Sequence, residues 1–115
     1  MSKKSLGVNL DASGGAIVEQ EVFRVPNGYK AIVTMFFMSN TGGSTTTVGA
    51  NWHDGATVPF LGNKSLGSGD YIQFGGPVGA FLCMQQDDHI DVSVASGGIV
   101  GLILSYELLR EDSQA

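Results

Sequence analysis

Apolar and polar residues alternate along much of this chain with the two-residue period of β-strands. In residues 89–95, Ile90, Val92 and Val94 predict a buried face, and the residues between them predict a polar one. The same period continues through residues 99–109, where alternate positions from Val100 to Leu108 are large and mainly apolar. No stretch shows the 3.6-residue period of an amphipathic helix. The pattern therefore predicts an all-β chain.

Turn signals separate these segments at short intervals. Pro26-Asn27-Gly28 and His53-Asp54-Gly55 are typical of tight turns, and the 17 glycines among 115 residues are about twice the usual share. This spacing predicts about eight short strands in a single antiparallel β-sandwich, jelly-roll-like, over residues 16–110. We expect residues 1–15 to be a flexible N-terminal arm and residues 111–115 a polar tail. Whether Val8 and Leu10 form a short edge strand within the arm stays open.

Residues 29–39 are unusual because both faces of the predicted strand are apolar. Strict alternation gives two sets: Ile32, Thr34, Phe36 and Met38 on one face, and Ala31, Val33, Met35 and Phe37 on the other. One sandwich core can bury only one set, so we predict that the other face contacts a further subunit or a host shell. The predicted interface consists of Val33, Met35, Phe37, Ile99 and Ile103. The alternative is that the N-terminal arm covers this face within one subunit.

Charge argues against a nucleic-acid partner, and hydropathy argues against a membrane partner. The net charge is −5, with eleven acidic and six basic residues, and the basic residues are scattered apart from the pair Lys3 and Lys4. Proteins that bind phosphate backbones carry a basic stripe, so we expect no nucleic-acid partner. The longest apolar run, residues 99–104, is far shorter than the ~20 residues of a membrane span, so we expect no membrane partner. The first seven residues lack the apolar segment of a secretory signal, which favours synthesis in the cytoplasm.

One charged segment could supply metal ligands. In an extended chain, Asp87, His89 and Asp91 project from one face, and carboxylates with an imidazole can hold a divalent cation. No ligand from another strand is identifiable, so we predict a solvated face with no metal and no cofactor. The lone cysteine, Cys83, lies in an apolar run and is expected to be buried.

Catalytic motifs are missing from the sequence. It has no Gly-x-Ser-x-Gly elbow, phosphate-binding loop or His-Glu-x-x-His zinc motif, so we predict that the protein is not an enzyme. Trp52 and Tyr29 are the main candidates for contact with a ligand such as a sugar, with Tyr71 as a third, because an aromatic ring offers a flat apolar face. Packing of Trp52 against the core is the alternative.

Five segments between residues 22 and 109 share their order with a known group of proteins. They are Phe23–Val33 with its Val-Pro-Asn-Gly turn, Ser39–Gly43, Gly69-Asp70, Asp87–Val92, and Leu104–Leu108 with Ser-Tyr in the final strand. In this the chain resembles small virion proteins of tailed bacteriophages, although Gln86-Asp87-Asp88 stands where a Gly-Asp turn is more usual.

The resemblance implies a non-enzymatic β-sandwich subunit of the virion, made in the host cytoplasm. It implies a capsid decoration (cement) protein that stabilises the particle as a homo-oligomer, with a trimer favoured, bound to the major capsid or tail protein. A tail accessory protein, or a receptor-binding or carbohydrate-binding tip module, is the alternative.

Overall fold

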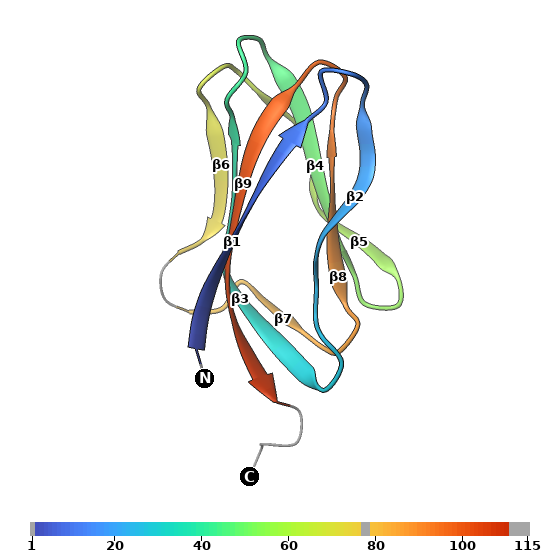
Figure 1. Cartoon of the computed structure of the whole chain (residues 1–115), viewed down its shortest axis with the longest axis vertical. Coiled ribbons are helices and arrows are strands. Elements are labelled where there is room, and N and C mark those ends of the chain that lie inside the picture. Colours follow the sequence, from blue (N-terminus) through green and yellow to red (C-terminus); the bar gives the residue numbers. More distant parts are fainter. Residues whose placement is uncertain (1, 77–78, 111–115) are drawn as a thin grey trace.

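Two antiparallel β-sheets pack face to face in the computed structural model, which describes residues 2–76 and 79–110 (Figure 1). Nine strands build them: β1 (Ser2–Asp11), β2 (Ile17–Arg24), β3 (Tyr29–Asn40), β4 (Thr46–His53), β5 (Thr57–Leu66), β6 (Tyr71–Gly75), β7 (Leu82–Met84), β8 (His89–Val94) and β9 (Ile99–Arg110). Over the described residues the chain forms no helix, and hence none that could cross a membrane. The prediction of an all-β sandwich is confirmed.

The strand order identifies the topology. The first sheet has the order β1-β9-β3-β6, with β7 also pairing with β3, and the second has the order β2-β8-β4-β5. Each strand of one sheet therefore has sequence neighbours mostly in the other sheet, which is the arrangement of a jelly roll. The jelly-roll-like prediction is confirmed by this order.

Two short strands, β6 and β7, form one edge of the first sheet. Strand β6 pairs with residues 35–39 of β3, and β7 pairs with residues 31–33. Both strands run antiparallel to β3. The chain leaves the sheet at Gly75, where φ is +76° and a Cβ would collide with the carbonyl oxygen of Thr34. It rejoins at Phe81, whose N–H donates to the Val33 carbonyl at 2.7 Å. The described part of residues 16–110 thus contains the eight expected strands, β2 to β9, and β1 is the ninth.

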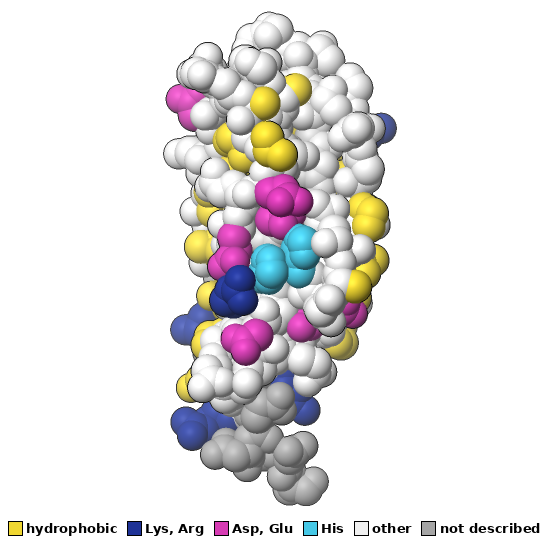
Figure 2. Space-filling view, turned by 90° about the vertical axis from the view of Figure 1, so that its right-hand side faces the viewer, with side chains coloured by type: hydrophobic (Ala, Val, Ile, Leu, Met, Phe, Trp, Pro, Cys, Tyr) yellow, Lys and Arg dark blue, Asp and Glu magenta, His cyan; other side chains and the backbone are white. Residues whose placement is uncertain are grey.

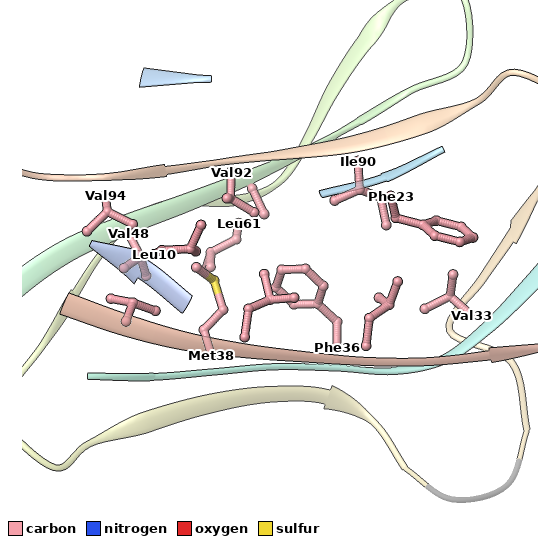
Figure 3. Close-up of a cluster of buried hydrophobic side chains, with 14 of the residues drawn as sticks. Leu10, Phe23, Val33, Phe36, Met38, Val48, Leu61, Ile90, Val92 and Val94 are labelled. Carbon is pink, nitrogen blue, oxygen red and sulfur yellow. The ribbon is translucent and has the colours of Figure 1, made fainter. Parts of the chain in front are cut away.

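The hydrophobic core lies between the sheets and follows the alternation of β8 and β9. Val92, Val94, Leu102 and Leu104 are buried, as their positions in the sequence predict. Figure 3 shows Phe36 and Met38 pointing from the first sheet towards Leu61, Val92 and Ile90 of the second. Burying each large side chain contributes roughly 1.5–3 kcal/mol, so this layer supplies most of the driving force for folding.

The N-terminal segment is an integral edge strand. Strand β1 pairs with β9 at ten successive positions, from Ser2 opposite Leu108 to Asp11 opposite Ile99. Leu6 and Val8 pack against the core and Leu10 lies within it, so the apolar side of β1 faces inward. The expectation of a flexible arm over residues 1–15 is wrong, and so is the alternative in which the arm covers the outer face. The predicted tail, 111–115, lies outside the described residues.

Strand β3 departs from strict alternation at one point. A β-bulge between Val33, opposite Tyr106, and Met35, opposite Ser105, adds one residue to β3. Val33 and Thr34 are consequently both buried, and the Thr34 hydroxyl donates to the Ser105 carbonyl at 3.2 Å. Val33 is fully buried in the core, so the prediction that it belongs to an interface is wrong.

Candidate functional site

The outer face of the first sheet carries no charged side chain over three rows of paired residues. Each row takes one residue from β1, β9, β3 and β6 in turn: Ser5-Ser105-Met35-Gly75, Gly7-Ile103-Phe37-Gln73, and Asn9-Gly101-Ser39-Tyr71. We call these twelve residues the uncharged face. An outer face of a sandwich normally meets water and carries polar and charged residues, so this composition needs an explanation.

Large apolar side chains project from the uncharged face and its margin. Ile103 is 43% exposed and Tyr71 is 61% exposed, and the Tyr71 ring centroid lies 5.4 Å from that of Phe37. Ile99, at the start of β9, is also exposed, and Met35 is partly buried. Four of the five residues predicted for an interface, all except Val33, therefore lie on or beside this face. Tyr71 was missed because the position of β6 beside β3 was unknown.

Two glycines hollow the uncharged face. Gly7 and Gly101 border a groove of about 430 Å³ that is also lined by Phe37 and Ile103. A Cβ at Gly7 would meet no atom within 4 Å, and one at Gly101 would meet only the Thr41 methyl group at 3.9 Å. The backbone therefore does not require glycine at either position. Because these two positions carry no side chain, the groove between Phe37 and Ile103 stays open.

The outer face of the second sheet has the opposite character. Figure 2 shows both histidines of the chain adjacent on this side, with acidic side chains and a basic one around them. Two rows cross the sheet: Arg24-His89-His53-Thr57 and Glu21-Asp91-Asn51-Pro59, from β2, β8, β4 and β5. We call these eight residues the histidine face.

Asp91 organises the histidine face from a buried position. Its side chain is only 7% exposed, and it accepts hydrogen bonds from Asn51 Nδ2 at 3.0 Å and His53 Nε2 at 2.5 Å. The other ring nitrogen of His53, Nδ1, bonds to the Thr57 hydroxyl at 3.1 Å. The His89 ring stacks on that of His53 with centroids 4.3 Å apart and an interplanar angle of 7°. These contacts fix the orientation of the His53 ring.

The structure changes the membership of the predicted charged cluster. Asp87, His89 and Asp91 were expected on one solvated face, but Asp91 is buried and Asp87 lies in a turn with φ of +71°. His53 takes a place in the cluster instead, 36 residues before His89 in the sequence. No local signal could have found it, because the register of β4 against β8 alone makes the two histidines direct neighbours.

A polar hollow adjoins the histidines. It has a volume of about 530 Å³ and is lined by both histidine side chains, Arg24 and the turns that contain Asp54, Asp87 and Asp88. The Arg24 guanidinium binds the Glu21 carboxylate at 2.7 Å, and this hydrogen bond lowers the pKa of Glu21. The same bond raises the pKa of Arg24.

The two aromatic residues predicted to contact a ligand are already engaged. Trp52 packs against the core from β4, and its Nε1 donates to the Asp88 carboxylate at 3.3 Å. Tyr29 also packs against the core, and the Arg110 guanidinium lies 5.9 Å from its ring centroid. Both residues are nevertheless partly exposed, so a ligand contact at these rings stays a prediction.

Cys83 is exposed and not buried as predicted. It is the central residue of β7, where its neighbours Leu82 and Met84 take the inward positions. The side chains of this short strand alternate between inward and outward positions, and Cys83 occupies the outward one.

Comparisons with known proteins identify a shared fold. A chain in the acidic stable capsid structure of Helicobacter pylori bacteriophage KHP30 aligns with a TM-score of 0.58 and 12% identity, over 95% of this chain and 92% of that one. PirA aligns with a TM-score of 0.44 and 18% identity, over 89% of this chain and 91% of that one. A chain of the T13 IBDV viral particle aligns with a TM-score of 0.36 and 12% identity, over 96% of this chain and 40% of that one. The last two alignments are too loose to bear on function. No family model and no curated protein matches this chain.

Proposed function

We propose that this chain is a non-enzymatic structural subunit of a bacteriophage particle, and specifically a capsid decoration protein. In this proposal it is made in the host cytoplasm, forms a homotrimer and binds the major capsid protein in the virion. The uncharged face carries the proposal, because it is the surface best suited to permanent contact with protein. Contiguous apolar patches of this kind on β-sheets usually mark such contacts.

The energetics of the uncharged face support its burial in an assembly. Ile103 and Tyr71 project into solvent in the isolated subunit, and Phe37 and Met35 are only partly covered. Complete burial of a large apolar side chain is worth roughly 1.5–3 kcal/mol relative to full exposure. The groove beside Gly101 additionally offers a position that one partner side chain can occupy.

The shared fold gives independent support to the same proposal. The KHP30 capsid chain aligns over nearly the whole of both chains, so it has about the length of this one and the same sandwich. A capsid structure can therefore include a subunit of this size and shape. The alternative of a carbohydrate-binding tip module is weakened, since two of its three expected contact residues, Trp52 and Tyr29, are engaged within the subunit, while the third, Tyr71, is exposed.

Labelling of particles tests the proposed location. Antibodies against the purified chain should label the shells of intact particles whose genome encodes it, as seen by immunogold electron microscopy. Labelling confined to tails would contradict the decoration role, and particles without any label or any peptide of the chain in mass spectrometry would contradict the virion role.

Rebinding to particles that lack the chain tests the proposed surface. Wild-type chain should bind such particles, whereas Gly101→Glu should bind at least tenfold more weakly because it places a charge in the groove. Gly62→Glu, on β5 of the opposite sheet, is the matched control, since a Cβ there meets no atom within 4 Å. Equal binding by both variants would show that the uncharged face is not the docking surface.

A further inference from the structure

The histidine face brings three side chains with metal-ligating atoms to one place. His53 and His89 are direct partners across β4 and β8, and Asp91 follows His89 by two residues on the same side of the sheet. One ligand atom from each lies within 4.8 Å of the other two. From the sequence we predicted a solvated face without a metal, because no ligand from a second strand was identifiable, and β4 supplies that ligand.

The donor set selects one class of ion. Two imidazole nitrogens and one carboxylate oxygen suit zinc and its neighbours among the divalent transition metals, whereas calcium and magnesium prefer sites made wholly of oxygen. Three protein ligands would leave one tetrahedral position open. The hollow lined by both histidines and Thr57 is next to that position and has room for a water molecule or a partner's side chain.

The surroundings of the three side chains resemble the support that metal ligands usually have. Asn51 donates to one oxygen of Asp91, and Thr57 bonds to Nδ1 of His53, so that Nε2 points towards the carboxylate. Such outer hydrogen bonds, here those from Asn51 and Thr57, orient metal ligands. On coordination the ion would replace the proton between His53 Nε2 and Asp91, and His53 would take the tautomer in which Nδ1 carries the proton and donates it to the Thr57 hydroxyl. Neither ring nitrogen of His89 has a hydrogen bond among the described residues, so both are available for coordination.

Local charge also favours a cation. Asp54, Asp87 and Asp88 belong to the turns that line the hollow, and Asp91 lies beneath His53. Arg24 is the basic residue in the hollow's lining, and its guanidinium is already paired with Glu21. A divalent ion would therefore enter a region with an excess of negative charge, where its own charge is stabilised.

Coordination requires a small change in the histidine pair. Zinc lies about 2.0–2.1 Å from each nitrogen and close to the plane of each ring, which two parallel stacked rings cannot both satisfy. One ring must therefore tilt. His53 is the last residue of β4 and His89 the first of β8, and both are partly exposed, so this rotation does not disturb the core.

We propose that His53, His89 and Asp91 form a binding site for one divalent transition-metal ion, with zinc as the ion to test first. The proposal does not depend on a role in the virion, because it concerns a different face of the subunit and is tested on the purified chain.

Isothermal titration calorimetry tests the proposal directly. The full chain, freed of any polyhistidine tag and carrying Cys83→Ser to remove the exposed thiol, is titrated with zinc chloride. We expect one ion per chain with micromolar or tighter affinity, and no binding of calcium or magnesium. Zinc at about a hundred times its Kd should raise the Tm by roughly 5–10 °C, and EDTA should reverse the rise.

Two matched variants identify the ligands. His89→Gln should weaken zinc binding at least tenfold and abolish the rise in Tm, while the ion-free protein keeps its circular dichroism spectrum. Asp87→Asn removes one charge from the same hollow without removing a proposed ligand, so it should change the Kd about twofold or less. Absence of zinc binding, equal binding by His89→Gln and the parent chain, or equal binding of calcium would each overturn the proposal.

Discussion

The two outer faces of this sandwich start from the same architecture and end with opposite chemistry. Each is built from the outward positions of four antiparallel strands, yet the uncharged face exposes Ile103 and Tyr71, while the histidine face holds Glu21, Arg24 and the buried Asp91. The core constrains only the inward positions, because those must be apolar for the sheets to pack. The outward positions are free to specialise, and here one sheet has the features of a protein contact and the other those of a polar site.

The largest expected effect on stability comes from substitutions on β3 at either side of the bulge, where buried and outward positions meet. Val33→Asp should cost about 4 kcal/mol or more in the free energy of unfolding, because it buries a charge among apolar side chains. Met35→Asp should stay within about 1 kcal/mol of wild type, since Met35 lies beyond the bulge on the outer side. Urea unfolding followed by circular dichroism measures both. Similar losses of stability for the two variants would mean that Val33 and Met35 lie on the same side of the sheet.

The buried carboxylate of the histidine face should matter next. Asp91→Ala leaves Asn51 Nδ2 and His53 Nε2 without their acceptor, which should cost about 1–3 kcal/mol of stability. Asp87→Asn, at an exposed turn residue with positive φ, should change stability by less than about 0.5 kcal/mol because asparagine tolerates that conformation. Equal unfolding midpoints in urea for the two variants would show that Asp91 does not organise this face.

Assembly in solution sharpens the contrast between the two faces. Wild-type protein at micromolar concentration should show a light-scattering mass about three times the 12.0 kDa of one chain. Ile103→Lys should shift that mass towards the monomer and raise the dissociation constant at least tenfold, because it charges the uncharged face. Val18→Lys replaces an even more exposed side chain, 74% exposed, on β2 of the other sheet, and should leave the mass unchanged. A monomeric wild-type protein would contradict a stable trimer.

The smallest effect concerns pH. The hydrogen bond from Arg24 lowers the pKa of Glu21 below its ordinary value of 4.5 in the folded protein. A lowered folded-state pKa gives stability that is present above the ordinary value and is lost as pH falls through the lowered one. Glu21→Gln should therefore lose less on acidification from pH 6 to pH 3 than wild type, by a difference in Tm of only a degree or two. The effect is small because both side chains are nearly half exposed and solvent screens the pair.

The sequence could predict those parts of the fold that depend on alternation within one strand. The inward residues of β8 and β9 follow directly from the period of two, and the turn signals fix most strand ends. The bulge in β3 could not be predicted, because Val33, Thr34 and Met35 carry no glycine or other local mark of an extra residue. In β1 the signal was present in Leu6, Val8 and Leu10, but the polar residues between them suggested an arm.

The candidate sites depend on register between strands, which no single-strand pattern contains. Ile99, Ile103, Met35 and Phe37 were identifiable as outward apolar residues, although the phase of β3 placed Val33 wrongly among them. The meeting of His53 with His89 follows from the pairing of β4 with β8, and the pairing partner of a strand is decided by the whole topology. Distant histidines in a β protein are therefore neighbours only once the sheet order is known.

The break between β6 and β7 also affects how readily another chain can add to this edge of the first sheet. An edge strand with a long row of unpaired N–H and C=O groups is a template on which another chain can add a strand, and bulges, short strands and lysines are the usual protections. The interruption at Gly75 divides one edge of the first sheet into segments of five and three residues. At the opposite edge, β1 carries Lys3 and Lys4. Both edges of the first sheet therefore carry features that disfavour the addition of a strand from another chain.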